Sequence, residues 1–299
     1  MTRALVIGRQ RKGRPIGHAV RETTQALQSA GWTVEHELVD RKRELRGRTK
    51  AAVKAEVDVV VVVGGDGAVL QVIQELAATS IALGIVPMGT GNLVAGNLGI
   101  PHRRDRAIEI ALAGHSRRID LGRVTVGGKR ELFAVACGIG FDAEVMDGTA
   151  TTQKLRWGKL AYVASAIRQG RRVQNVSHEI RLDGVRGTMK ASQVFIANFG
   201  RMGLAMEPRL KVEPDDGLLD VIVVRASGPL PGLLAGWEAL RQTELGESPE
   251  GHAFRARARK IHVRTKLPRL VEVDGSVIGS TPIKATIRPA ALTVLVPKP

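Results

Sequence analysis

Two short glycine loops, each between an apolar run and a helical pattern, constrain this chain most. The first, Gly64–Gly67 (GGDG), directly follows Val57–Val63, a run that is almost entirely β-branched. The second, Pro87–Asn92 (PMGTGN), follows the apolar run Ile81–Val86. Apolar strands that alternate with helices are typical of a parallel sheet covered on both faces. Because the carboxyl ends of such strands share one edge, we expect both loops to line one crevice.

Both loops have the chemistry of an anion-binding site. Glycines allow a close approach of the backbone to a phosphate group, and the helix that follows offers unpaired N–H groups and the positive end of its dipole. Thr90 and Asn92 add a hydroxyl and an amide. No Gly-Lys-Ser/Thr follows GGDG, which excludes a Walker loop, and a GxGxxG dinucleotide site is poorly supported. For GGDG by itself, a plain strand-to-helix turn remains the alternative.

The chain changes character near residue 120. Before it, strand and helix patterns alternate, and Arg104–Ala113 is the last predicted helix. After it, short alternating strands such as Glu131–Ala136 dominate, with two helical stretches near Leu155–Arg168 and Leu230–Gln242. We therefore predict a parallel α/β nucleotide-binding domain over residues 1–120 and a mostly antiparallel, β-rich domain over residues 121–288.

Charge narrows the class of partner. The formal net charge is +16, which attracts polyanions. Aromatic residues make up only 3% of the chain, so stacking platforms for nucleic acid are scarce, and we expect no nucleic-acid partner. An anionic membrane surface or a phosphorylated small molecule is favoured, with basic clusters at Arg41–Lys54, Arg168–Arg172 and Arg255–Lys260 as candidate membrane contacts. No apolar run has membrane-spanning length, so the expected contact is peripheral. Cys137 is the only cysteine, which fits a reducing cytoplasm.

Several motifs, in the same order, resemble the family of diacylglycerol kinases, sphingosine kinases and bacterial lipid kinases. They are GGDG, PMGTGN, VACGIGFDAEV, EPDDGLLDVIVV, VEVDGSVIG and the tail LTVLVP, and they cover nearly the whole chain. The resemblance implies a nucleotide domain like those of NAD kinase and diacylglycerol kinase, a β-sandwich lipid-substrate domain, and ATP between them. It also implies that residues 289–299 return to the first domain.

The resemblance assigns roles to residues of the loops and of an acidic turn. The implied nucleotide-binding set is Gly64, Gly65, Asp66, Gly67, Ala68, Gln71, Gly89, Thr90, Gly91 and Asn92. The implied Mg²⁺ site consists of the Asp216 carboxylate with the backbone carbonyls of Glu213 and Leu218. Such oxygen ligands suit a hard cation. Without the resemblance, this segment is a tight turn before a strand.

The proton acceptor is assigned to Asp274, again by resemblance. The family pattern is Asp-Gly-Glu, and Ser276 stands at the Glu position, so Ser276 is at best a positioning group. Asp66 is the second candidate, because the related NAD kinases have a GGDG aspartate near the reacting hydroxyl. Two further departures are Ala68, where the family usually has Thr, and Arg9–Gly13 (RQRKG), where it has an Asn-Pro-x-Ser-Gly loop. Arg11 or Lys12 could approach phosphates there.

The expected reaction is phosphorylation of the hydroxyl of diacylglycerol or a related lipid alcohol by ATP with Mg²⁺. This activity belongs to phospholipid biosynthesis, and we expect a cytoplasmic protein associated peripherally with the inner face of the membrane. Two alternatives stay open: a soluble NAD-kinase-like enzyme for small molecules, and a catalytically weak nucleotide-binding regulator, favoured by Ala68 and Ser276. A homodimer is also open.

Overall fold

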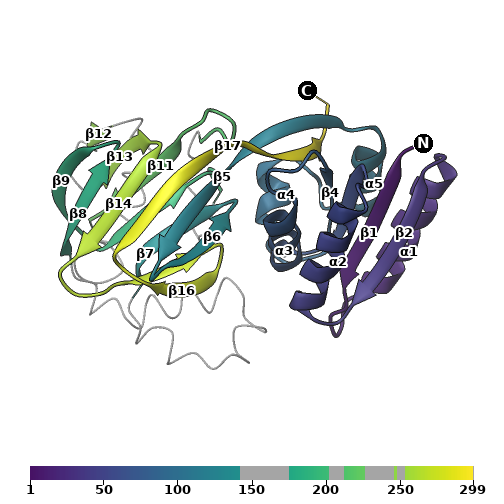
Figure 1. Cartoon of the computed structure of the whole chain (residues 1–299), viewed down its shortest axis with the longest axis horizontal. Coiled ribbons are helices and arrows are strands. Elements are labelled where there is room, and N and C mark those ends of the chain that lie inside the picture. Colours follow the sequence, from purple (N-terminus) through teal and green to yellow (C-terminus); the bar gives the residue numbers. More distant parts are fainter. Residues whose placement is uncertain (142–174, 202–211, 226–245, 248–252, 299) are drawn as a thin grey trace. The chain divides into compact units, whose positions relative to one another are not determined.

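A computed structural model describes residues 1–141, 175–201, 212–225, 246–247 and 253–298. The chain divides into two compact units (Figure 1). One comprises Met1–Asp120 together with Ala290–Pro299, and the other comprises Leu121–Pro289. No helix among the described residues is long and apolar enough to cross a membrane.

The first unit contains a parallel sheet in the order β2-β1-β3-β4-β17. Its strands are β1 (Arg3–Arg9), β2 (Thr33–Val39), β3 (Val59–Gly64), β4 (Ala82–Pro87) and the end of β17 (Ile283–Val296). Each neighbouring pair runs parallel, and β17 pairs with β4 through Thr293 and Val294. Every residue of β3 and β4 is buried, as expected for central strands covered on both faces.

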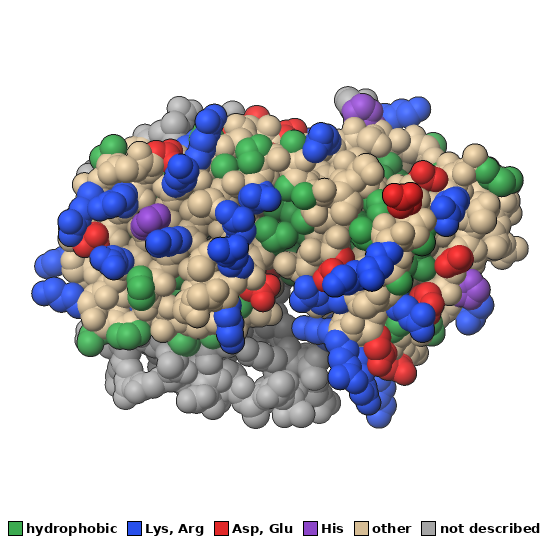
Figure 2. Space-filling model, viewed as in Figure 1, with side chains coloured by type: hydrophobic (Ala, Val, Ile, Leu, Met, Phe, Trp, Pro, Cys, Tyr) green, Lys and Arg blue, Asp and Glu red, His purple; other side chains and the backbone are tan. Residues whose placement is uncertain are grey.

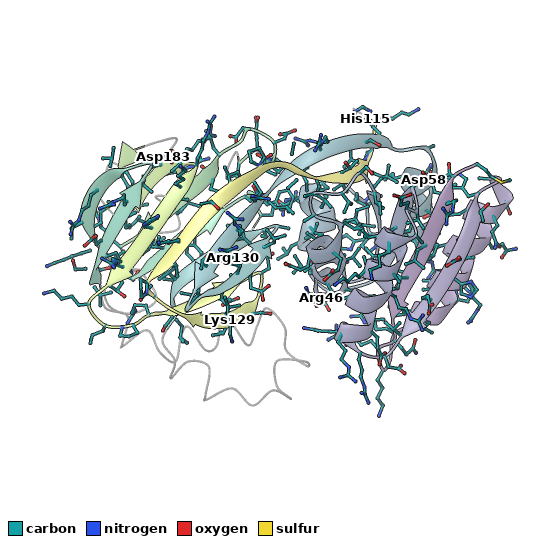
Figure 3. All side chains as sticks on the ribbon, in the orientation of Figure 1. Arg46, Asp58, His115, Lys129, Arg130 and Asp183 are labelled. Atoms are coloured by element: carbon teal, nitrogen blue, oxygen red, sulfur yellow. The ribbon has the colours of Figure 1, made fainter. Side chains whose placement is uncertain are left out.

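Five helices accompany this sheet in the described chain. They are α1 (Ile16–Ser29), α2 (Lys42–Lys54), α3 (Asp66–Leu76), α4 (Leu93–Asn97) and α5 (Arg104–Ala113). Helix α1 packs against α5, and α2 packs against α3. Arg46 of α2, labelled in Figure 3, donates a hydrogen bond of 2.7 Å to Glu75 of α3. This pairing holds α3, whose first residue is Asp66 of GGDG, beside its neighbour.

The second unit is built from antiparallel strands in two sheets. The first sheet contains β5 (His115–Val126), β6 (Lys129–Phe133), β8 (Val176–Leu182), β9 (Val185–Ala191), β14 (Lys260–Thr265) and the beginning of β17. The second contains β7 (Ala136–Phe141), β10 (Gln193–Ala197), β11 (Leu219–Val224), β12 (Gly246–Glu247), β13 (Ala253–Ala258), β15 (Leu270–Val273) and β16 (Ser276–Ser280). Buried side chains from both sheets, including Phe133, Ile139, Ile196 and Val263, form one core.

The predicted fold class is confirmed: an α/β unit with a parallel sheet and a second, β-rich unit. The helix predicted over Arg104–Ala113 has those limits. The single strand predicted over Glu131–Ala136 is instead the end of β6 and the start of β7, because the chain bends at Ala134 and Val135. The predicted helices near Leu155–Arg168 and Leu230–Gln242 lie outside the described residues.

Candidate functional site

The two glycine loops meet at the carboxyl edge of the parallel sheet. Gly64 and Pro87 are partners in the pairing of β3 with β4, and the Met88 N–H donates to the Gly64 carbonyl at 2.8 Å. A Cβ atom added to Gly65 would lie 2.8 Å from the Gly89 Cα, and one added to Gly89 would lie 2.6 Å from the Gly65 Cα. The two backbones therefore touch, which only glycine permits at these positions.

Asn92 holds the second loop in shape from within. Its backbone has a φ of 48°, in the left-handed region that Asn tolerates better than most residues. The side chain is 3% exposed, and its Oδ1 accepts the Gly89 N–H at 2.8 Å. Its Nδ2 donates to the Gly89 carbonyl at 3.1 Å and lies 3.0 Å from His102 Nδ1. The Asn92 amide is thus occupied within the protein, and it fixes the backbone of Gly89.

Asp66 joins the first loop to the second. It is half-buried at the first position of α3, where a negative charge is favoured by the helix dipole. Its Oδ1 accepts the backbone N–H of Val94, in α4, at 3.1 Å. Gly91 is close to the other oxygen, since a Cβ added there would lie 3.0 Å from Asp66 Oδ2. One carboxylate therefore fixes the spacing of the two loops.

The remaining predicted nucleotide-binding residues differ in exposure. Gly67, Thr90 and Gly91 are exposed, whereas Gln71 is half-buried on α3. Ala68 is only 7% exposed, and a Cβ on Gly64 would lie 2.8 Å from the Ala68 Cβ. Ala68 therefore packs beneath the loop, where a larger side chain would require the loop to shift.

A third loop, between β1 and α1, reaches the same edge. Arg14 Nη2 donates to Thr90 Oγ1 at 3.2 Å. The sequence had pointed to Arg11 and Lys12, which are exposed, but not to Arg14. The signal was present, because β1 is parallel to β3 and its carboxyl end must lie at the same edge. The edge thus combines glycine backbone, helix N-terminus and a guanidinium group, which together suit a phosphate.

In the acidic turn of the second unit, Asp216 contacts both the backbone of the turn and an arginine. Asp216 Oδ1 accepts the Leu218 N–H at 2.9 Å, and Oδ2 lies 3.6 Å from Arg257 Nη1. Glu213 is exposed. Among the described residues, no group of three or more His, Cys, Asp or Glu side chains could hold a metal ion. The Mg²⁺ site of one carboxylate and two backbone carbonyls stays a prediction.

Arg255, from the basic cluster predicted over Arg255–Lys260, is buried in an ion pair. Its side chain is 5% exposed and lies 2.6 Å from Asp220 Oδ1, while Arg257 Nε lies 3.6 Å from the same oxygen. Burial raises the pKa of Asp220, and the hydrogen bond and charge of Arg255 oppose that rise. Arg255 is therefore paired with a buried carboxylate and cannot contact a membrane surface. The cluster at Arg168–Arg172 lies outside the described residues.

Asp274 binds the backbone where β6 gives way to β7. Its Oδ2 accepts the Ala134 N–H at 2.8 Å, and its Oδ1 accepts the N–H groups of Val135 and Ala136 at 3.0 and 2.9 Å. Ser276, two residues on, is exposed. Cys137, in the adjacent strand, is fully buried, and burial raises the pKa of its thiol, which makes it an unreactive core residue.

Comparison with known proteins agrees with this arrangement. The family model described as "Diacylglycerol kinase catalytic domain" matches residues 3–124. The model described as "YegS C-terminal NAD kinase beta sandwich-like domain" matches residues 135–296. A crystal structure of a diacylglycerol kinase from Bacillus anthracis str. Sterne has the same fold, with a TM-score of 0.75 and 21% sequence identity over 99% of this chain and 96% of that one.

Sequence relatives carry corresponding names. A diacylglycerol kinase of Mycobacterium tuberculosis is 31% identical over 264 residues, which cover 83% of this chain and 80% of the relative. A protein of Escherichia coli named "Probable lipid kinase YegS" is 27% identical over 220 residues, covering 72% of this chain and 73% of that protein. A Synechocystis protein without an assigned function is 29% identical, and the match spans 89% of this chain but only 62% of that protein. The chain therefore belongs to the diacylglycerol kinase family of phosphotransferases with an alcohol acceptor.

Proposed function

We propose that this protein transfers the γ-phosphoryl group of ATP to the hydroxyl of diacylglycerol or a closely related lipid alcohol. The observation that carries the proposal is the contact between Gly65 and Gly89 at the N-terminus of α3. At this contact the edge of the sheet carries no side chains of its own. Backbone N–H groups at a helix N-terminus bind phosphate oxygens. Family membership and the names of the relatives support the choice of a lipid alcohol as acceptor.

The nucleotide phosphates would lie on the residues of this edge. The N–H groups of Asp66 and Gly67 precede the first hydrogen bond of α3, which Ala68 donates to Gly65, so these two groups are suited to the phosphate oxygens. Arg14, held at Thr90, would neutralise part of the phosphate charge. Asn92 and the Oδ1 atom of Asp66 would keep the loops at a fixed separation. Catalysis in this scheme comes mainly from positioning and charge neutralisation.

The hydrogen bonds of the two candidate carboxylates favour Asp66 over Asp274 as the proton acceptor. Three N–H donors stabilise the negative charge of Asp274, and a carboxylate stabilised in this way accepts a proton less readily. The hydrogen bonds described for Asp66 include one such donor, the N–H of Val94. In the proposed step the lipid oxygen attacks the γ-phosphorus, the bond to the departing ADP oxygen breaks, and the lipid proton passes to Asp66. Asp274 would act by holding the backbone of Ala134–Ala136.

For Mg²⁺ we propose the turn of Asp216 with the carbonyls of Glu213 and Leu218. Bound Mg²⁺ would supply positive charge that stabilises the turn. Arg257, 3.6 Å from Asp216 Oδ2, already compensates part of the charge of the carboxylate, so this site would be weak. Thermal unfolding of the protein and of Asp216→Asn with and without Mg²⁺ tests the site without any measurement of activity. A rise in Tm that the variant lacks would support it.

For the second unit, Leu121–Pro289, we propose the role of lipid-substrate domain, and for the protein a peripheral position at an anionic membrane surface. The decisive experiment incubates the purified chain with γ-labelled ATP and Mg²⁺, in detergent micelles that carry diacylglycerol or other lipid alcohols, and separately with NAD. Labelled diacylglycerol supports the proposal. Labelled NAD without detergent would support a small-molecule kinase instead. Tight ATP binding with no labelled acceptor would support a nucleotide-binding regulator.

A further inference from the structure

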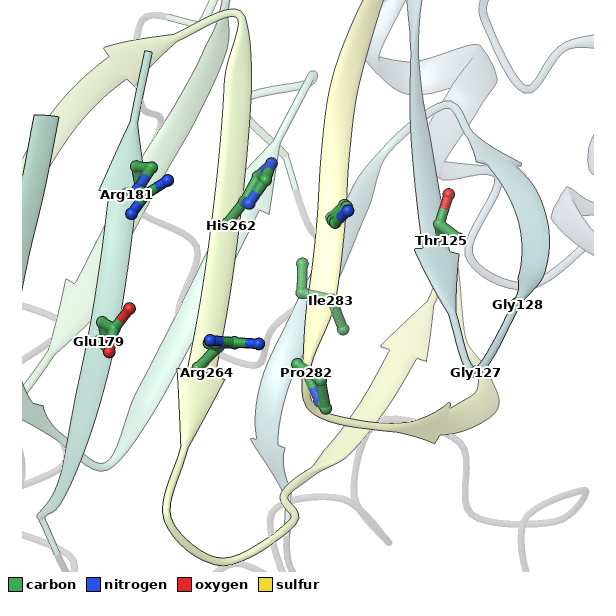
Figure 4. A pocket seen from close by; sticks show the side chains of 10 residues that line it. Thr125, Gly127, Gly128, Glu179, Arg181, His262, Arg264, Pro282 and Ile283 are labelled. Carbon is green, nitrogen blue, oxygen red and sulfur yellow. The ribbon is translucent and has the colours of Figure 1, made fainter. Parts of the chain in front are cut away.

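A row of basic side chains crosses three neighbouring strands of the second unit. Arg181 of β8 stands directly opposite His262 of β14, and His262 stands directly opposite Lys284 of β17. Arg264 lies two residues further along β14, on the same face. Figure 4 shows the Arg181 and His262 side chains on adjacent strands, with Arg264 below them. The residues that alternate with this row, Ile180, Ile261, Val263, Ile283 and Ala285, are buried in the core.

The row lines a groove of about 430 Å³. The turn at Gly127 and Gly128, between β5 and β6, contributes to its wall, together with the Thr125 side chain. Glu179 is the one acidic residue among the lining residues, and it already accepts a hydrogen bond of 2.7 Å from Arg186. Figure 2 shows Lys and Arg side chains over β8, β14 and β17 on the viewed face. The groove is therefore concave and positively charged.

Three positive side chains of the groove, Arg181, Arg264 and Lys284, share it with one carboxylate, that of Glu179, which already binds Arg186. These three side chains take part in no ion pair within the described chain. Arg181 stands directly opposite Arg186 of β9, and like charges in such positions, about 5 Å apart at their Cβ atoms, destabilise a sheet, whereas Arg264 stands opposite Glu179. The positive charges of the groove also act on His262. Burial lowers the pKa of its imidazole, and the charges of Lys284, Arg181 and Arg264 lower this pKa further. An anion bound in the groove would offset the repulsion among these cations.

We propose that this groove is a binding site for a phosphate group, separate from the glycine loops. Arg181 and Lys284 lie on either side of His262, so their backbones are two strand spacings, about 10 Å, apart. Their side chains are long enough to reach a group between them. A phosphate between them would accept charge-assisted hydrogen bonds from both and a hydrogen bond from the imidazole N–H. The phosphate could belong to the headgroup of a membrane lipid or to a soluble ion or ester, and two experimental arms distinguish these sources.

The first arm follows the imidazole resonance of His262 by NMR while inorganic phosphate is added at constant ionic strength. The resonance is assigned with His262→Gln, so that binding at the glycine loops is not mistaken for binding in the groove. We expect a saturable shift and, because a bound anion stabilises the imidazolium, a higher pKa of His262. Lys284→Gln and Arg181→Gln should each weaken the apparent affinity about tenfold, the loss of one charge-assisted contact. Lys190→Gln is the matched control, because Lys190 is an exposed β9 residue outside the groove.

The second arm measures sedimentation of the full chain with phosphatidylcholine vesicles, with and without phosphatidic acid. If the ligand is a headgroup, the Arg181→Gln/Lys284→Gln double variant should lose most of its phosphatidic-acid-dependent binding, while Lys190→Gln keeps it. A response of His262 to inorganic phosphate with unchanged vesicle binding would identify a soluble phosphate as the ligand.

The proposal is overturned if inorganic phosphate leaves His262 unshifted and the double variant binds vesicles like the wild type. It is also overturned if Lys190→Gln loses as much binding as the double variant, because the effect would then depend on net charge alone. Neither arm measures phosphoryl transfer, so failure here is distinct from failure of the proposed kinase activity.

Discussion

Polar side chains hold the backbone in place both at the glycine edge of the first unit and at the acidic turns of the second, but the two regions differ in how many bonds each carboxylate makes. At the glycine edge, the Asn92 amide pairs with the N–H and the carbonyl of Gly89, and Asp66 accepts the Val94 N–H, so that the start of α3 is held beside the second loop. At the acidic turns, carboxylates are consumed by local structure. Asp274 accepts three backbone N–H groups, and Asp216 accepts one and lies beside Arg257. The difference teaches that an aspartate in a motif can accept a proton or bind a ligand only if its neighbours do not already occupy its oxygens.

The largest expected effect is on turnover at Asp66. Asp66→Asn keeps an oxygen that can accept the Val94 N–H but removes the carboxylate charge, so the loops should stay in place while proton acceptance is lost. We expect kcat with diacylglycerol to fall by about 10²–10⁴-fold, the usual contribution of general base catalysis. Steady-state kinetics measure this, and ATP affinity should change little. A variant that turned over like the wild type would return the role to Asp274.

Asp274→Asn should act on stability more than on chemistry. We expect a loss of about 1–3 kcal/mol in the free energy of unfolding, because three N–H groups lose an anionic acceptor. Denaturant unfolding measures it. The matched control is Asp183→Asn: Asp183 also precedes a turn glycine, has a positive φ, and accepts the N–H groups of Arg259 and Lys260, but it is exposed. Equal losses in both variants would remove any special role of Asp274 in positioning the backbone.

A methyl group at the contact of the two loops should weaken nucleotide binding. In Gly89→Ala the new Cβ would lie 2.6 Å from both Asn92 Oδ1 and the Gly65 Cα, so the loops must separate. We expect ATP affinity to fall about tenfold, equivalent to roughly 1.4 kcal/mol. Titration calorimetry measures this against Gly47→Ala, whose Cβ meets nothing within 4 Å on α2. Unchanged ATP affinity in Gly89→Ala would show that nucleotide binding does not depend on the contact between the two loops.

The smallest expected effect is at Arg14. Arg14→Gln removes an exposed guanidinium and its bond to Thr90, and an exposed contact of this kind contributes about 0.2–1 kcal/mol. The KM for ATP should therefore rise by no more than about fivefold. Arg43→Gln on α2, which removes an exposed arginine away from the loops, should leave KM unchanged. An effect of equal size in both variants would indicate long-range charge rather than contact.

The sequence predicted the fold well because its signals are local and repeated. β-branched runs such as Val59–Val63, followed by glycine and helical periodicity, specify a parallel sheet before any tertiary contact is known. The meeting of Gly65 with Gly89 also follows from the shared edge of parallel strands. The break between β6 and β7 could not be read from Glu131–Ala136, because it coincides with the hydrogen bonds of Asp274, about 140 residues away. The basic groove was missed for the same reason, since Arg181, His262 and Lys284 meet only through strand register.

The most direct test of the contrast between the two units is amide hydrogen exchange of the full chain, followed by mass spectrometry, with and without a non-hydrolysable ATP analogue and Mg²⁺. Bound phosphates should protect the amides of Asp66, Gly67, Thr90 and Gly91, whereas those of Ala68 and Gly89 already donate to Gly65 and Asn92. They should leave those of Ala134–Ala136, already bonded to Asp274, unchanged. Saturating nucleotide that leaves both glycine loops unprotected would contradict the account.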